Sequence, residues 1–199
     1  MLQHIILGRT LNYHKIPSHL YWKEYTQTAG QEKSGTEAGS LFVRGDQGWT
    51  EGLHPMDRFI KNTHEILGPL NALTAQMPMT GHQFLTTDRK IQQSVFGKGK
   101  QAVIATVNMS SNNYTCTSGN GEGITLPLYG FLVESPTFIA FYAQNWNGIH
   151  YDTPALFTMR NLEDKPLSQS KQVHVFHGFG DNRIKIGEKI HTVTREAVL

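Results

Sequence analysis

Residues 126–148 read LPLYGFLVESPTFIAFYAQNWNG and form the most apolar segment of the chain. Residues 131–133 are a short run of β-forming residues, Glu134, Ser135 and Pro136 supply turn chemistry, and residues 138–142 resume the apolar run. The pattern predicts two strands joined by a tight turn. Because apolar side chains occur at both odd and even positions, we expect both faces of these strands to be covered by other parts of the protein.

The sequence on both sides of this segment predicts further short strands, separated by turn residues. They cover residues 81–85, 90–96, 102–108, 112–116, 155–159 and 173–178. Residues 97–100 are expected to be a hairpin turn. Residues 119–123 are expected to be a flexible loop and not a phosphate-binding loop, because they lack its Lys-Ser/Thr pair and a following helix. Together these strands predict an antiparallel β-sandwich over residues 77–186, followed by a C-terminal tail over residues 187–199.

The N-terminal part is expected to be helical. Residues 2–7 fit either a buried strand or the last turn of a helix. Pro55 begins the clearest helix, because a proline at the first helical position loses only an N–H that has no partner there. Gly68 and Pro69 are expected to break or kink this helix, leaving a second short helix to about Ala75. Apolar residues form one stripe along it: Met56, Phe59, Ile60, Ile66, Leu67, Leu70 and Leu73.

Composition excludes several classes of protein. The net charge of the 199 residues is +2, too small to argue for a nucleic-acid partner or an anionic membrane. The single cysteine, Cys116, excludes an internal disulfide and a multi-cysteine metal site. The first residues lack the features of a signal peptide, and no stretch approaches the ~20 apolar residues of a membrane span. The cellular location stays open.

Two polar segments near the N-terminus hold candidate site residues. Tyr13, His14 and Trp22 lie in a ring-rich stretch predicted to be a loop, where aromatic faces and imidazole groups suit a sugar or a cofactor. Asp46 and Glu51 lie in a glycine-punctuated loop, and a pair of carboxylates is the minimum for glycoside hydrolysis. Packing of the rings and simple solvation of the two carboxylates are the alternatives that remain open.

Two groups in the β-rich part are candidate ligand sites. Trp146, Tyr151 and Asp152, beside Gly148, suit a carbohydrate-stacking patch, with a structural role as the alternative. His174 and His177 lie near Asp181, but strand alternation places the two histidines on opposite faces, which is poor geometry for binding one metal ion. We therefore expect no metal ion and no cofactor.

Three segments together resemble the C-terminal portion of large bacterial glycoside-hydrolase-like proteins, in which a (β/α)8 barrel is followed by an all-β domain. They are residues 42–74 (FVRGDQGWTEGLHPMDRFIKNTHEILGPLNALT), residues 79–108 (MTGHQFLTTDRKIQQSVFGKGKQAVIATVN) and residues 123–143 (GITLPLYGFLVESPTFIAFYA). Leu128 stands where these proteins often have a second proline. The likeness covers about two-thirds of the chain and lies in the arrangement of the pieces.

The resemblance implies that residues 1–76 are one or two βα units like the end of such a barrel. A complete barrel needs about 250 residues, so most of the strand ends that carry catalytic groups would be absent. The chain would then be an accessory region without independent catalysis, and the barrel would be a missing domain or a partner chain. In that case the apolar stripe of the Pro55 helix and residues 13–22 should form an uncovered apolar patch.

Two other functions stay open. One is a carbohydrate-binding module that uses Trp49, Trp146 and Tyr151, with carbohydrate as its partner. The other is a small stand-alone glycoside hydrolase that uses Asp46, Glu51 and a histidine.

Overall fold

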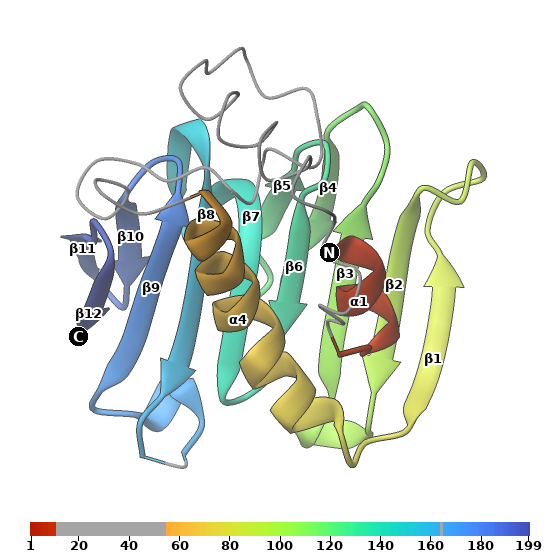
Figure 1. The fold of residues 1–199 in the computed structure, drawn as a ribbon, viewed down its shortest axis with the longest axis horizontal. Coiled ribbons are helices and arrows are strands. Elements are labelled where there is room, and N and C mark those ends of the chain that lie inside the picture. The colour runs from red at the N-terminus through yellow and green to blue at the C-terminus, as the bar shows by residue number, and fades with distance from the viewer. Residues whose placement is uncertain (11–54, 164) are drawn as a thin grey trace.

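The computed structural model describes residues 1–10, 55–163 and 165–199, which form a mainly β protein with two helices near the N-terminus (Figure 1). The helices are α1 (Leu2–Leu7) and α4 (Pro55–Thr74), and the strands are β1 (Met79–Phe84), β2 (Ile91–Phe96), β3 (Val103–Asn108), β4 (Tyr114–Thr117), β5 (Gly123–Leu126), β6 (Phe131–Glu134), β7 (Phe138–Trp146), β8 (Ile149–Asn161), β9 (Val173–Phe179), β10 (Arg183–Ile186), β11 (Lys189–Thr192) and β12 (Glu196–Val198). Two short 3-10 helices, η2 (Gly99–Gln101) and η3 (Leu167–Gln169), lie between strands.

Eight of the strands form one antiparallel sheet in the order β1-β2-β3-β6-β7-β8-β9-β12. The hairpin predicted within residues 126–148 is confirmed as β6 and β7, which lie in the middle of this sheet. Its turn is held by Ser135, whose backbone N–H donates to the Phe138 carbonyl at 2.9 Å and whose Oγ accepts the Phe138 N–H at 2.9 Å. The expectation of a mainly β fold with a helical N-terminal part is confirmed, but the described residues contain no (β/α)8 barrel.

Two hydrophobic clusters cover the two faces of the sheet. The helices α1 and α4 lie on one face (Figure 1). There, Ile66 of α4 and Ile5 of α1 pack in a cluster that contains Phe131 of β6. The other cluster contains Leu132 of β6 and joins the two-stranded sheets β4-β5 and β10-β11, through residues such as Ile184. Because successive side chains of a strand point to opposite faces, Phe131 and Leu132 confirm that both faces of this hairpin are covered.

The helices differ from their predicted form in two ways. Residues 2–7, for which strand and helix were both open, are the helix α1, which ends at Gly8 in the left-handed conformation with φ of 61°. α4 runs without a break through Gly68 and Pro69, so the predicted separate second helix is wrong. Burial of Ile66 and Leu70 on either side of Pro69 explains the continuity, because packing outweighs the one backbone hydrogen bond that proline removes.

The apolar stripe of α4 packs against the protein's own sheet. Ile66, Leu67 and Leu70 are at most 2% exposed, whereas Ile60, one turn and a half nearer the N-terminus, is 40% exposed. The prediction that this stripe would be left uncovered is therefore wrong for the second half of the helix. Residues 13–22, the other half of that prediction, lie outside the described residues. Neither α1 nor α4 has the length and apolar character that would let it cross a membrane.

Several strands were predicted incompletely. β8 is longer than residues 155–159, because it begins at a tight turn in which Asn147 and Gly148 have φ of 50° and 80°. The strand expected over residues 112–116 is β4, which pairs with β5 in a separate two-stranded sheet. β12, within the expected C-terminal tail, pairs with β9 at one edge of the sheet. The boundaries predicted after residues 76 and 186, between the N-terminal part, the β-sandwich and the C-terminal tail, remain predictions.

Candidate functional site

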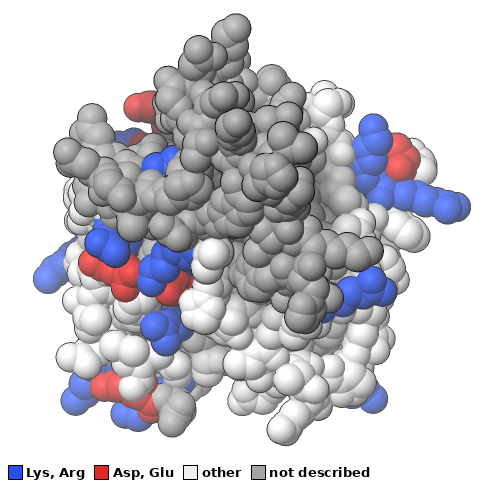
Figure 2. Space-filling view, viewed as in Figure 1, with Lys and Arg blue, Asp and Glu red and all other residues white. Residues whose placement is uncertain are grey.

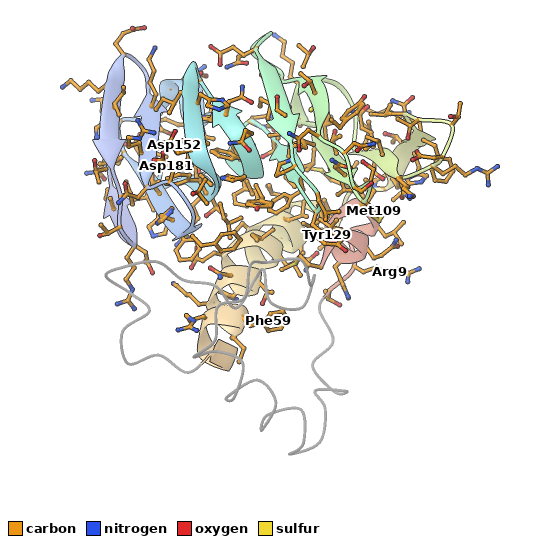
Figure 3. All side chains as sticks on the ribbon, turned by 90° about the horizontal axis from the view of Figure 1, so that it is seen from above. Arg9, Phe59, Met109, Tyr129, Asp152 and Asp181 are labelled. Carbon is orange, nitrogen blue, oxygen red and sulfur yellow. The ribbon has the colours of Figure 1, made fainter. Side chains whose placement is uncertain are left out.

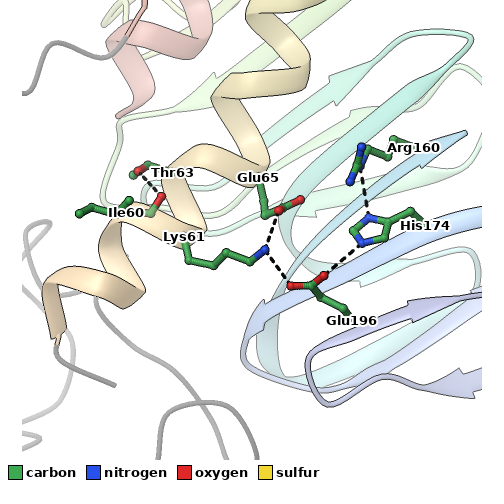
Figure 4. Close-up of polar contacts among 7 residues, drawn as sticks. All are labelled: Ile60, Lys61, Thr63, Glu65, Arg160, His174 and Glu196. Atoms are coloured by element: carbon green, nitrogen blue, oxygen red, sulfur yellow. Dashed lines mark hydrogen bonds and ion pairs between the residues drawn. The ribbon is translucent and has the colours of Figure 1, made fainter. Parts of the chain in front are cut away.

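Five polar side chains meet where α4 lies against the β12 end of the sheet (Figure 4). We call them the polar cluster: Lys61, Glu65, Arg160, His174 and Glu196. The Lys61 amine lies 2.8 Å from Glu65 Oε1 and 2.7 Å from Glu196 Oε1, and His174 Nε2 lies 3.3 Å from Glu196 Oε2. Figure 2 shows basic and acidic atoms side by side over this part of the surface. The cluster thus joins helix α4 to strands β8, β9 and β12.

The hydrogen bonds of His174 decide what the polar cluster can do chemically. Arg160 Nε donates to His174 Nδ1 at 3.3 Å. Because a guanidinium group has no acceptor, Nδ1 must accept, and the ring carries its proton on Nε2, from which it donates to Glu196. To exchange a proton with a substrate, His174 would have to give up one of these two contacts. The arrangement suits the attachment of β12 to the sheet better than acid–base catalysis.

The same contacts shift the pKa values of Lys61 and Glu196. Burial acts to lower the pKa of Lys61, but hydrogen bonds to Glu196 and Glu65 outweigh it and the pKa is raised. Burial acts to raise the pKa of Glu196, but the contacts with Lys61 and His174 outweigh it and the pKa is lowered. The stability that Glu196 contributes is therefore present above its unfolded pKa and is lost as the pH falls through its folded pKa.

Only part of the polar cluster could be found from sequence. Lys61 and Glu65 are four residues apart on one helix, a spacing that brings side chains together, and this signal was missed. Glu196 belongs to a three-residue strand whose position depends on pairing with β9. Its contact with Lys61 is long-range, and no local pattern predicts it.

Replacing Lys61 with methionine should lower the free energy of unfolding by about 2 kcal/mol, because it leaves the Glu65 carboxylate, 8% exposed, without its cation. The double variant Lys61→Met with Glu65→Leu should recover most of that loss, which a double-mutant cycle by urea unfolding will measure. Lys165→Met is the matched control, because Lys165 lies 3.7 Å from Glu163 and is 54% exposed; it should change stability by less than about 0.5 kcal/mol. Equal losses of unfolding free energy in Lys61→Met and Lys165→Met would contradict the stabilising role of the Lys61–Glu65 pair.

Most of the predicted site residues lie outside the described part of the chain. Tyr13, His14, Trp22, Asp46, Trp49 and Glu51 all belong to this group.

Two of the remaining predicted residues, Trp146 and Tyr151, are buried. Trp146 is 5% exposed and stacks on Phe141, with ring centroids 4.5 Å apart and an interplanar angle of 13°. Tyr151 is 0% exposed and packs in the same hydrophobic cluster. A sugar-binding role for these rings remains a prediction, and it would require them to leave the core.

A second polar group lies near Tyr151, where Asp152 and Asp181 are neighbours (Figure 3). Arg183 Nε donates to Asp181 Oδ1 at 2.9 Å, and Arg183 Nη2 contacts Oδ2 of the same carboxylate. Hydrogen bonds from Arg183 lower the pKa of Asp181, whereas burial, helped by the Asp181 charge, raises the pKa of Tyr151. Asp181 is thus a paired carboxylate and a weak base.

The two histidines of β9 are separated by the sheet. His174 contacts Glu196 in the polar cluster, whereas the His177 ring lies 4.9 Å from that of Phe157, in the cluster on the opposite face. The predicted separation of these side chains is confirmed. Within the described residues, no three His, Cys, Asp or Glu side chains are placed so that they could hold one metal ion.

Cys116 of β4 lies near Glu134, a half-buried carboxylate at the end of β6. Burial raises the pKa of Glu134 even though the Gly119 N–H donates to its Oε1 at 2.9 Å. Burial, together with the charge of Glu134, raises the pKa of the Cys116 thiol to about 11. The side chain is therefore a thiol at neutral pH, which is the form that packs in a core and not the form that acts as a nucleophile.

Iodoacetamide should alkylate Cys116 roughly 100-fold more slowly at pH 8 than it alkylates a free cysteine, because the thiolate fraction is that much smaller. Since Cys116 is the only cysteine, mass spectrometry of the intact chain follows this reaction directly. The same reaction in 6 M guanidinium chloride, about the concentration that unfolds even very stable domains, is the control and should run at the free-thiol rate. A native rate equal to the denatured rate would contradict the raised pKa.

No family model, no curated protein and no solved structure matches this chain.

Proposed function

We propose that this chain is a C-terminal accessory β-sheet region of a glycoside-hydrolase-like protein, without catalysis of its own. The observation that carries the proposal is where two of the resembling segments lie. Residues 79–108 supply β1, β2 and β3, and residues 123–143 supply β5, β6 and most of β7. Apart from β5, which pairs with β4, these strands are consecutive neighbours in one sheet. The resemblance therefore concerns a continuous structural unit and not scattered pieces.

In this proposal the fold is a β-sandwich with an incomplete second layer. The two-stranded sheets β4-β5 and β10-β11 share a hydrophobic cluster with the face of the large sheet that is opposite α4. Packing of sheet on sheet through such a cluster is how sandwich cores form. The helix α4 closes the other face, so the unit has a core of its own.

The absence of independent catalysis is supported by how three carboxylates of the described residues are used. The carboxylates of Glu65 and Glu196 are paired with Lys61, and that of Asp181 is paired with Arg183. Groups held in this way stabilise the contacts between helix, sheet and small β-sheets. The reacting carboxylates of the glycoside hydrolase would then belong to a barrel in a missing domain or in a partner chain.

The proposal is tested by measuring hydrolysis of a panel of aryl glycosides by the wild-type chain and by Glu51→Gln. We expect no turnover from either protein. Turnover by the wild type that is lost in Glu51→Gln would overturn the proposal in favour of a small glycoside hydrolase. A saturable change in tryptophan fluorescence on titration with an oligosaccharide would overturn it in favour of a carbohydrate-binding module.

A positive test uses the barrel itself. If a neighbouring reading frame encodes a glycoside-hydrolase-like barrel, its purified product should bind this chain, and the melting temperature of the barrel should rise on binding. A barrel product that is stable alone and shows no binding by calorimetry would contradict the bracing role.

A further inference from the structure

The two edges of the eight-stranded sheet differ in how they are protected. β12 has only three residues, and its Glu196 is held by Lys61 and His174. β1 has six residues, nearly all exposed, and its sequence MTGHQF contains neither a charged residue nor a proline. Natural edge strands are usually short, charged or interrupted, because an open edge pairs with other strands. β1 has one interruption, a register shift between Met79 and Gly81, but from Gly81 to Phe84 it pairs regularly with β2, and its other side has no strand partner among the described residues.

The backbone of β1 presents alternate residues to the open side. The Leu85 N–H donates to the Ile91 carbonyl at 2.9 Å, so the hydrogen-bonding groups of Leu85 face β2. In an antiparallel pair these groups alternate, so Gln83 also faces β2, whereas the N–H and C=O groups of His82 and Phe84 face outward. In the part of the chain that the structure describes, β1 is the last strand of the sheet on this side.

An amide ladder crosses the sheet and ends at this edge. Gln83 Nε2 donates to Gln93 Oε1 at 2.8 Å, and Gln93 Nε2 donates to Thr106 Oγ1 at 3.1 Å. An amide side chain has two donor hydrogens and an oxygen that accepts two bonds, so Gln83 keeps one donor and its Oε1 for a further partner. A second amide in the reverse orientation would accept from the remaining donor of Gln83 and donate to its Oε1. Gln83 of a second copy supplies such an amide.

We propose that β1 pairs antiparallel with β1 of a second copy of this chain, about a two-fold axis at Gln83. The outward-facing groups of His82 then bond those of Phe84 of the second copy, and the reverse, which gives an isologous interface. The two Gln83 amides face each other and join the two ladders. On the other face, Phe84, which is 49% exposed and edge-on to His82 at 5.3 Å, is covered by the second His82.

Arg89 is a charged group beside the proposed interface, because its guanidinium carbon lies 5.6 Å from the centre of the Phe84 ring. The charged residues nearest to β1 in sequence are Asp88 and Arg89 in the turn before β2, and the antiparallel pairing places the turns of the two copies at opposite ends of the interface. The inference is independent of the proposed function, because the association is measured without a sugar or a barrel.

Sedimentation velocity of the whole 199-residue chain over a range of concentrations tests the pairing. The mass of the wild type should rise from 22.4 kDa toward twice that value. Gln83→Glu places two carboxylates opposite each other and should weaken dimerisation at pH 7 at least about tenfold. Gln101→Glu, the same change on an exposed residue of η2, is the control and should leave the dimer unchanged. Thermal unfolding of both variants checks that the monomer fold is intact.

Residue-resolved hydrogen exchange gives a second readout with an alternating pattern. At concentrations that favour the dimer, the amides of His82 and Phe84 should exchange slowly, and they should become fast in Gln83→Glu, while Gln83 and Leu85 amides remain protected in both states. A chain that stays monomeric at every concentration would overturn the proposal. The purified chain would also stay monomeric if β1 pairs with a strand of another protein, so that result would overturn self-pairing in either case. The proposal would also be overturned by a dimer whose affinity is unchanged in Gln83→Glu and in which the His82 and Phe84 amides exchange fast.

Discussion

Gly180→Ala should lower the free energy of unfolding by more than about 4 kcal/mol, a large fraction of the roughly 5–15 kcal/mol that stabilises a typical domain. Gly180 has φ of +89°, a conformation that side chains with a Cβ rarely adopt. A Cβ there would lie 2.0 Å from the Pro154 carbonyl oxygen and 2.9 Å from Ala155 Cα. Both are backbone atoms of β8, so the strand itself would have to move. Chemical denaturation followed by circular dichroism measures the loss.

Gly148→Ala is the matched control for this prediction. Gly148 also has a positive φ, of +80°, but a Cβ there would meet nothing within 4 Å. Its cost should be only the backbone strain, about 1–2 kcal/mol. The difference between the two alanine variants then measures the close approach of the chain after β9 to β8. Equal losses would show that strain alone, without the contact with Pro154, accounts for the effect.

Asn108→Asp should destabilise the protein by about 4 kcal/mol at pH 7, because it buries a carboxylate among carbonyl oxygens. Asn108 is 0% exposed, and its Nδ2 donates to the carbonyl oxygens of Asn112, Leu126 and Pro127 at 2.8, 2.8 and 3.0 Å. Its Oδ1 accepts from the backbone N–H and the hydroxyl of Ser110. This one side chain therefore ties the loop after β3 to the chain between β5 and β6.

Three measurements separate the loss of donors at Asn108 from other effects. Asn108→Ala should cost less than Asn108→Asp at pH 7, because it removes the hydrogen bonds without burying a charge. The deficit of Asn108→Asp should shrink as the pH falls, since burial among carbonyl oxygens raises the folded pKa of the new carboxyl and favours its protonated, donating form. Asn113→Asp, on an exposed residue of the same loop, should change stability by less than about 0.5 kcal/mol. If Asn113→Asp lost as much stability as Asn108→Asp, the buried hydrogen bonds of Asn108 would not be the cause of the loss.

The elements that sequence predicted well are those decided within a few residues. The turn at Ser135 follows from local turn chemistry, and the two-sided apolar pattern around it predicts the central hairpin that β6 and β7 form. The start of a helix at Pro55 follows from one residue and the stripe behind it. At Pro69 the local rule failed, because the proline lies in a helix that is buried against the sheet by Ile66 and Leu70.

The candidate site could hardly be predicted, because its members come from distant parts of the chain. Trp146 and Tyr151 are the kind of residues that bind sugars when exposed, and sequence does not reveal whether a ring faces water or a core. The structure buries both. Conversely, Glu196 carries no local signal, and it gains its contacts with Lys61 and His174 only when β12 pairs with β9.

The sequence by itself determined that this is a mainly β protein with an apolar central hairpin, a helix from Pro55 and one cysteine, because periodicity, turn residues and composition are local properties. Only the tertiary structure decided that α4 covers one face of the sheet and that Lys61 holds the last strand through Glu196. It also decided that the uncharged strand β1 lies at an open edge. Strand order and edges depend on which distant segments pair, and that pairing is decided by packing of the whole chain.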